Sequence, residues 1–207
     1  RCFGWRIRPR SGLLHSSRHR GLMGGATMVC MSTALKTSSA KTDGGRGVGA
    51  LRKLAMVIVT YKRRELLSTL FDSIASLTVA PWRIIVVDNE NSAQTRSMVN
   101  DLSARLNGQW GSTIADASGN ESRVVYAPQD DNRGGAGGFS AGVRTAYELG
   151  AQWFWVMDDD VAVLPDAIDK LSRWAGRHDV IQGSRYDYDG GPFYWQYDFV
   201  VPLGIPN

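Results

Sequence analysis

Residues 54–77 read LAMVIVTYKRRELLSTLFDSIASL, and this stretch decides the fold. Its first seven residues form an apolar, largely β-branched run that is typical of a strand buried on both faces. From Arg64 onward the apolar residues recur with a helical period, at positions 66, 67, 70, 71, 74 and 77. A buried strand followed at once by an amphipathic helix predicts an α/β fold with parallel strands.

The alternation of strand and helix continues along the chain. Further strands are expected at 83–87, 123–127, 152–157 and 180–182, and further helices at 94–106, at 139–149 and from Pro165 to about Ala175. The polar stretch 107–122 is expected to be a surface loop. Because strand–helix–strand connections are right-handed, the pattern predicts a mostly parallel sheet with helices on both faces. Such a sheet binds ligands beyond the carboxyl ends of its strands.

Residues 1–53 differ in composition from the rest of the 207-residue chain. They carry eleven Lys and Arg but a single acid, Asp43, whereas residues 54–207 carry 13 basic and 19 acidic residues. This Arg- and Ser-rich segment is expected to be a disordered leader, either a transit-like peptide or non-native upstream sequence, since Met recurs at 23, 28 and 31. The domain is therefore placed at 54–207. The net charge of +4 for the whole chain is positive only because of the leader, since residues 54–207 have more acidic than basic residues, so no nucleic-acid partner is expected.

Composition also excludes several classes of site. No apolar run approaches the length of about 18 residues that a transmembrane helix needs, so no transmembrane segment is expected. Cys2 and Cys30 both lie in the leader, and the three histidines are scattered. A disulfide framework and a metal site built from Cys or His are therefore excluded. Any metal would have to be held by carboxylates.

Three consecutive acids, Asp158, Asp159 and Asp160, close the apolar strand at 152–157. Neighbouring carboxylates repel one another unless a cation neutralises them. In an extended chain Asp158 and Asp160 point to one side and Asp159 to the other. We expect Asp158 and Asp160 to hold Mg²⁺ or Mn²⁺, with phosphate oxygens and water completing the shell. The alternative is an acidic turn that caps the next helix.

A glycine-rich segment at 131–142, DNRGGAGGFSAG, follows the third expected strand. Its glycines let the backbone approach a flat ligand or present amide groups at a helix start. The alternative is a flexible loop followed by a helix whose glycines serve packing. The segment is neither a P-loop nor a dinucleotide fingerprint, because it lacks a Gly-Lys-Ser/Thr sequence and Ser140 stands where the third glycine should be.

Each of the other candidate residues has two possible interpretations. Asp88, at the end of the second strand, can accept hydrogen bonds from a base or ribose, or form an Asx turn with Asn89. Arg133 and Arg144 can meet phosphate charge or remain solvated. The aromatic residues that can either stack on a sugar or pack on the sheet are Tyr186, Tyr188, Phe193, Tyr194, Trp195 and Tyr197.

Four segments together resemble the nucleotide-sugar half of a family 2 glycosyltransferase of GT-A fold. They are VIVTYKR at 57–63, VVDN at 86–89, NRGGAGGF at 132–139 and DDD at 158–160. The last two are especially similar to galactofuranosyltransferases that build bacterial cell-wall galactan, and to rhamnosyltransferase-like enzymes. The resemblance covers roughly residues 54–200, and it is more specific to the fold and the donor class than to the sugar.

The resemblance implies a metal-dependent, inverting enzyme that transfers a sugar from a UDP-sugar to a lipid-linked or polysaccharide acceptor. Galactofuranose is its candidate sugar, and a cytoplasmic location is implied, with peripheral contact to the inner membrane face through the acceptor. The resemblance assigns the metal to Asp158 and Asp160. It assigns nucleotide-sugar contacts to Thr60, Asp88, Asn132, Gly134, Gly135, Asp158 and Asp159.

In this family the catalytic general base follows the acidic motif at a long interval. We therefore expect it beyond Asn207, and the chain is expected to be truncated at its C-terminal end. This leaves open a nucleotide-sugar-binding segment without transferase activity. A third reading, a pyrophosphorylase-type nucleotidyltransferase, predicts a glycine-rich loop after the first strand, where this chain has Thr60-Tyr61-Lys62-Arg63.

Overall fold

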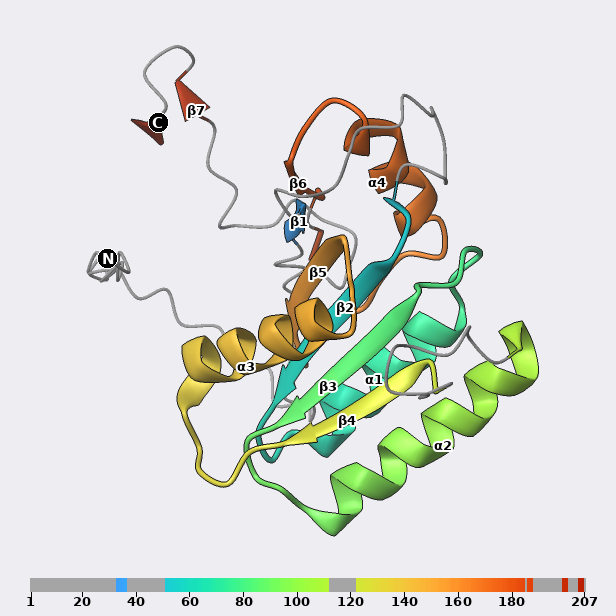
Figure 1. The fold of residues 1–207 in the computed structure, drawn as a ribbon, viewed down its shortest axis with the longest axis vertical. Coiled ribbons are helices and arrows are strands. Elements are labelled where there is room, and N and C mark those ends of the chain that lie inside the picture. The colour runs from blue at the N-terminus through green and yellow to red at the C-terminus, as the bar shows by residue number, and fades with distance from the viewer. Residues whose placement is uncertain are drawn as a thin grey trace, which may run out of the picture.

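The computed structural model describes residues 33–36, 51–111, 122–184, 186–187, 199–200 and 205–206. Within these residues one sheet has six strands in the order β4-β3-β2-β5-β1-β6 (Figure 1). The strands are β1 (Thr33–Lys36), β2 (Leu54–Thr60), β3 (Arg83–Asp88), β4 (Val124–Pro128), β5 (Trp153–Asp158) and β6 (Val180–Gln182). The helices are α1 (Arg64–Ala75), α2 (Ala93–Trp110), α3 (Gly134–Glu148) and α4 (Ala167–Ala175). Two short strands, β7 (Phe199–Val200) and β8 (Ile205–Pro206), pair separately.

The sheet is mostly parallel. β2, β3, β4 and β5 run in the same direction, while β1 pairs antiparallel with both β5 and β6. Every residue of β2 is buried, as expected for a central strand covered on both faces. The apolar run at 54–60 therefore occupies the position that its composition predicted.

Helices cover both faces of the sheet. Leu54, Met56 and Ile58 of β2 belong to a core cluster that includes side chains of α1, α2 and α4. Ala55, Val57 and Val59 point to the opposite face, where α3 packs. Figure 1 shows α3 on the near side of the sheet, with α1 and α2 on the far side. The expected α/β class, a mostly parallel sheet with helices on both faces, is confirmed.

The largest differences from the predicted helix boundaries are at the end of α2 and the start of α3, and α4 also begins at Ala167 rather than at Pro165. α2 continues through residues 107–110, which were expected to be loop, because Trp110 packs against the main core. It ends at Gly111, whose φ of 74° suits glycine and whose N–H donates to the carbonyl of Asn107. α3 starts at Gly134 rather than at Phe139. The remainder of the expected loop, 112–121, lies outside the described residues.

The expected leader contains a strand of the sheet. Residues 33–36 form β1, which lies between β5 and β6 and pairs with both. This corrects the prediction that all of residues 1–53 are disordered. The pairing joins residues far apart in sequence, and four residues are too few to show a period. The remaining leader residues 1–32 and 37–50 lie outside the described part of the chain.

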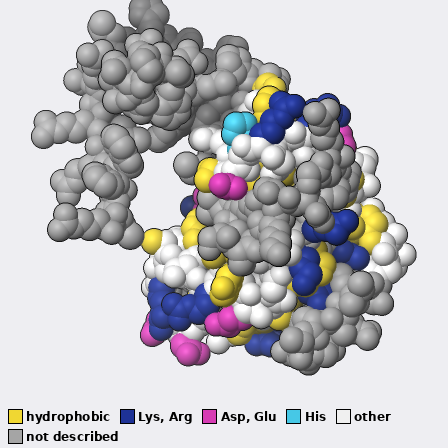
Figure 2. Space-filling view, turned by 45° about the horizontal axis from the view of Figure 1, so that its top comes forward, with side chains coloured by type: hydrophobic (Ala, Val, Ile, Leu, Met, Phe, Trp, Pro, Cys, Tyr) yellow, Lys and Arg dark blue, Asp and Glu magenta, His cyan; other side chains and the backbone are white. Residues whose placement is uncertain are grey.

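Surface charge is mixed on the face drawn in Figure 2, where basic and acidic side chains alternate with apolar ones outside the grey regions. Among the described helices, none combines the length and the hydropathy that a membrane crossing requires.

Candidate functional site

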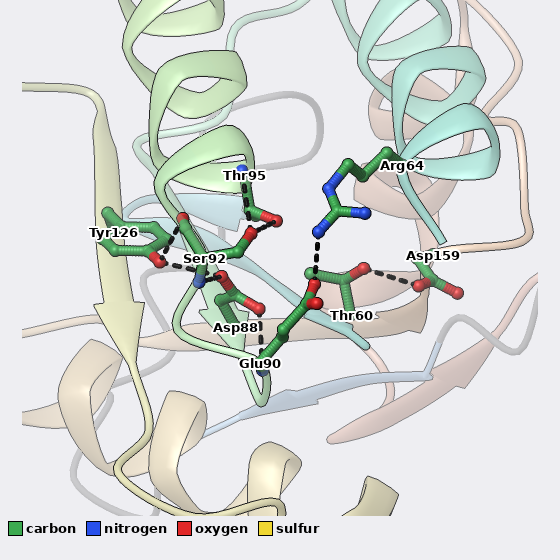
Figure 3. A network of polar contacts seen from close by, with 8 residues as sticks. All are labelled: Thr60, Arg64, Asp88, Glu90, Ser92, Thr95, Tyr126 and Asp159. Carbon is green, nitrogen blue, oxygen red and sulfur yellow. Dashed lines mark hydrogen bonds and ion pairs between the residues drawn. The ribbon is translucent and has the colours of Figure 1, made fainter. Parts of the chain in front are cut away.

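The carboxyl ends of the parallel strands bring the predicted site residues to one edge of the sheet. In the pairing register, Thr60 of β2 lies beside Asp88 of β3, and Val59 lies beside Asp158 of β5. The segment from β4 to α3 runs along the same edge, because the backbone N–H of Gln129 donates to the carbonyl of Asp88. Figure 3 shows the polar contacts that connect these strand ends.

Asp159 ties β5 to the end of β2. The Oγ1 of Thr60 donates to Oδ2 of Asp159 at 2.7 Å, and both residues are 3% exposed (Figure 3). Nη1 of Arg63 donates to the other oxygen, Oδ1, at 3.3 Å. Burial raises the pKa of Asp159, while the Thr60 hydrogen bond and the Arg63 charge act in the opposite direction. Asp159, which the resemblance assigned to the nucleotide sugar, thus has both oxygens engaged within the protein.

Asp158 and Asp160 are less buried than Asp159. Burial raises the pKa of Asp158, and the negative charges of Asp160 and Asp159 raise it further. Oδ2 of Asp160 accepts a hydrogen bond from Nη1 of Arg63 at 3.1 Å. Both carboxyl groups remain partly open at the edge of the sheet.

The carboxylates of Asp158 and Asp160 could supply only part of the coordination shell of a hard divalent cation. In the part of the chain that the structure describes, no group of three or more His, Cys, Asp and Glu side chains is placed to hold a metal ion. Mg²⁺ commonly binds through one or two carboxylates and takes its other ligands from phosphate and water. Asp158 and Asp160 fit that donor set.

Asp88 is fully buried and organises the turn that follows β3. Its Oδ1 accepts the N–H of Glu90 at 2.9 Å, and its Oδ2 accepts the N–H of Ser92 and the hydroxyl of Tyr126, each at 2.8 Å (Figure 3). Burial, followed by the hydrogen bond and charge of Asp88, raises the pKa of Tyr126 to about 12. The structure favours the turn interpretation of Asp88, although its partners are Glu90 and Ser92 rather than Asn89.

The glycine-rich segment divides into two parts with different roles. Gly138 and Gly142 let α3 lie close to the sheet, because a Cβ at Gly142 would stand 2.5 Å from Val57 and 2.7 Å from Val87. A Cβ at Gly138 would stand 2.6 Å from Val59. The packing alternative is therefore correct for these two glycines.

The other part of the segment forms the start of α3. A Cβ at Gly134 or Gly135 would meet no atom within 4 Å, so space is open beside both. Oδ1 of Asn132 accepts the N–H of Gly134 at 2.9 Å, and Nδ2 of Asn89 donates to the carbonyl of Gly134 at 3.1 Å. Asn132 thus orders the helix start and leaves these two glycines accessible.

Three charged residues that were not predicted as site residues, Arg63, Arg64 and Glu90, also lie at this edge. Nη2 of Arg64 contacts Oε2 of Glu90 at 2.6 Å, which joins the start of α1 to the turn after β3 (Figure 3). Their only sequence signal is position, because all three come within four residues of a strand end.

Several other candidates are not brought into this network. Arg133 precedes α3 and is exposed, and Arg144 lines a groove between α3 and β5. Tyr186 lines a cavity of about 880 Å³ between α4 and β6. The remaining aromatic candidates, Tyr188, Phe193, Tyr194, Trp195 and Tyr197, lie outside the described residues.

The sequence profile of the family "Glycosyl transferase family 2" matches residues 55–202. Galactofuranosyltransferase GlfT1 of Mycolicibacterium smegmatis is 38% identical over 104 residues, which are 50% of this chain and 28% of that protein. Galactofuranosyltransferase GlfT1 of Mycobacterium tuberculosis is 36% identical over 104 residues, or 50% of this chain and 29% of that protein. The match thus spans less than a third of the length of these relatives.

Two solved structures show a weaker likeness. S. aureus TarS 1-349 in complex with UDP superposes with a TM-score of 0.47 and 16% identity, over 61% of this chain and 32% of that one. Mannosyltransferase PcManGT from Pyrobaculum calidifontis, in complex with GDP-Man and Mn²⁺, gives a TM-score of 0.46 and 16% identity over 66% and 36% of the two chains. The fold assignment therefore rests on the sheet itself and on the family match.

Proposed function

This chain belongs to glycosyltransferase family 2, and we propose that it forms the donor-binding part of an enzyme that takes a sugar from a UDP-sugar. One observation carries the proposal: the family match at 55–202 contains Thr60, Asn132 and Asp158–Asp160, which the sheet gathers at one edge. The family expected from the four motifs is confirmed.

Galactofuranose is the donor sugar that we propose, because two relatives at 36–38% identity are galactofuranosyltransferases. The acceptor in this proposal is a lipid-linked or polysaccharide glycan. A lipid-linked acceptor would place the reaction at the inner face of a membrane.

The proposed donor site uses the open groups of the edge. Asp158 and Asp160 would hold Mg²⁺ or Mn²⁺, which would supply positive charge to the departing diphosphate. Gly134 and Gly135 offer accessible backbone for the nucleoside, and Asn132 keeps that backbone in place. Asp88 and Asp159 act from within the protein, by fixing the turn after β3 and the end of β5.

In the proposed reaction an acceptor hydroxyl attacks the anomeric carbon, the bond to UDP breaks, and the configuration inverts. The hydroxyl proton would go to a general base. No described residue is assigned that role. Donor binding without transfer is the second candidate.

Calorimetry of UDP with the 207-residue chain tests the proposal. We expect UDP to bind with Mn²⁺ present and to lose most of its affinity when EDTA is added. Asp158→Asn should remove the dependence on Mn²⁺ and leave uridine binding unchanged. The matched control is Asp169→Asn, because Asp169 lies on α4 and pairs with Arg173. Equal affinity with and without EDTA would refute the metal assignment, and no UDP binding in either condition would refute donor binding.

A further inference from the structure

The residue before α1 directs a guanidinium group at the acidic end of β5. Nη1 of Arg63 lies 3.1 Å from Oδ2 of Asp160 and 3.3 Å from Oδ1 of Asp159. These oxygens belong to the acidic cluster formed by Asp158, Asp159 and Asp160, where the proposed function places a divalent cation. We propose that Arg63 and that cation compete for Asp160, the carboxylate that both would contact, so that Arg63 sets the metal affinity of the site. This inference rests on the proposed function.

The backbone of the β2–α1 turn aims Arg63 at the cluster. Lys62 has a φ of 61°, in the left-handed region that residues other than glycine rarely adopt. This residue reverses the chain between the end of β2 and the start of α1. The Thr60–Asp159 hydrogen bond holds the other side of the contact. The position of Arg63 is therefore set by the fold on both sides.

Arg63 is also placed so that it can leave. Its side chain is 54% exposed, whereas that of Asp159 is 4% exposed, so the arginine can move into solvent without opening the core. The N-terminal end of a helix disfavours a positive charge, and α1 has no side-chain hydrogen bond at its N-cap. The aspartates are the groups that hold Arg63 there.

The charges of the cluster favour exchange of one cation for the other. Arg63 pairs with Asp159 and Asp160, and its charge also acts on the neighbouring Asp158. When all three acids are ionised, this one positive charge leaves two negative charges uncompensated. A divalent cation matches that remainder. Its binding would bring a second positive charge to Asp160, where Arg63 and the metal would repel each other. Metal binding in wild type therefore includes the cost of displacing Arg63.

Titration of Mn²⁺ alone into the 207-residue chain tests this competition, with free Mn²⁺ measured by electron paramagnetic resonance. Arg63→Gln should bind Mn²⁺ about tenfold more tightly than wild type, because a neighbouring positive charge is removed. Arg63→Lys keeps the charge and should stay within about twofold of wild type. Arg64→Gln is the matched control, because it removes the next guanidinium, which pairs with Glu90 and not with the aspartates.

Each outcome decides the inference. Unchanged or weaker Mn²⁺ binding by Arg63→Gln would overturn it, as would an equal gain in Arg64→Gln. If no variant binds Mn²⁺, there is no cation to displace Arg63 and the inference fails, while UDP calorimetry still decides donor binding separately. Arg63→Ala is a second variant with the same expected gain in case Arg63→Gln does not fold. Thermal unfolding gives an independent measurement, in which Mn²⁺ should stabilise Arg63→Gln more than wild type.

Discussion

Replacing Thr60 with valine tests the hydrogen bond that joins β2 to the end of β5. Valine keeps the shape of threonine but removes the hydroxyl that donates to Asp159 at 2.7 Å. Both residues are 3% exposed, so water cannot take the place of the lost donor. A hydrogen bond to a charged group contributes about 1.5–3 kcal/mol, and we expect the free energy of unfolding at neutral pH to fall by about 2 kcal/mol.

The loss should depend on pH with a defined sign. The Thr60 hydrogen bond lowers the pKa of Asp159 against the raising effect of burial, so Thr60→Val raises that pKa further. A group whose pKa is higher in the folded than in the unfolded state binds its proton more tightly when folded. Stability therefore falls as pH rises from the unfolded value, near 3.8, through the folded one. The penalty should be largest at neutral pH and smallest in acid.

Thermal and urea unfolding, followed by circular dichroism, measure this effect. A loss of 2 kcal/mol corresponds to a fall in Tm of about 4–8 °C for a chain of this size. Thr69→Val is the control, because that hydroxyl contacts the carbonyl of Glu65 on the exposed side of α1. Its cost should stay within about 0.5 kcal/mol. Equal losses for the two threonines, or a Thr60→Val loss that does not shrink in acid, would refute the reasoning.

Two further predictions concern stability. Gly142→Ala should destabilise the protein by about 1–3 kcal/mol, because its Cβ would contact Val57 and Val87. Gly135→Ala places its Cβ in open space and should be neutral or stabilise by up to about 1 kcal/mol. Urea unfolding compares the two variants, and equal effects would contradict the packing role of Gly142. Asp158→Asn should raise the Tm at neutral pH and lose this advantage in acid, because burial and the neighbouring acids raise the pKa of Asp158 and make its ionised form costly. A lower Tm for Asp158→Asn at neutral pH would contradict that account.

The central strands could be predicted from the sequence because their residues are apolar throughout. β2 and β3 are buried along their whole length. The composition of such strands identifies them even when the neighbouring strands are unknown. α3 was harder, because glycine disfavours a helix and the segment 134–138 reads as loop. The sheet stabilises that helix through close approach at Gly138 and Gly142, which is a tertiary effect. β1 was missed because its pairing is entirely long-range.

The position of the site could be predicted from the sequence, but the contacts between its side chains could not. Topology alone puts Thr60, Asp88 and Asp158 at one edge of the sheet. The hydrogen-bond partner of each acid depends on turn geometry. Asp88 was therefore assigned to a ligand, although it accepts the backbone N–H groups of Glu90 and Ser92. The role that we propose for Arg63 depends on the left-handed conformation of Lys62, which no local sequence pattern predicts.

Burial divides the acids of this edge into two kinds. Asp88 and Asp159 are buried, and the protein itself supplies their hydrogen-bond donors, so their substitution should first reduce stability. Asp158 and Asp160 are partly exposed, and Asp160 shares its one described partner, Arg63, with Asp159. The repulsion between these two carboxylates destabilises the folded chain, and a bound cation would reduce it. An effect on UDP binding without loss of stability is therefore the signature that separates the second pair from the first.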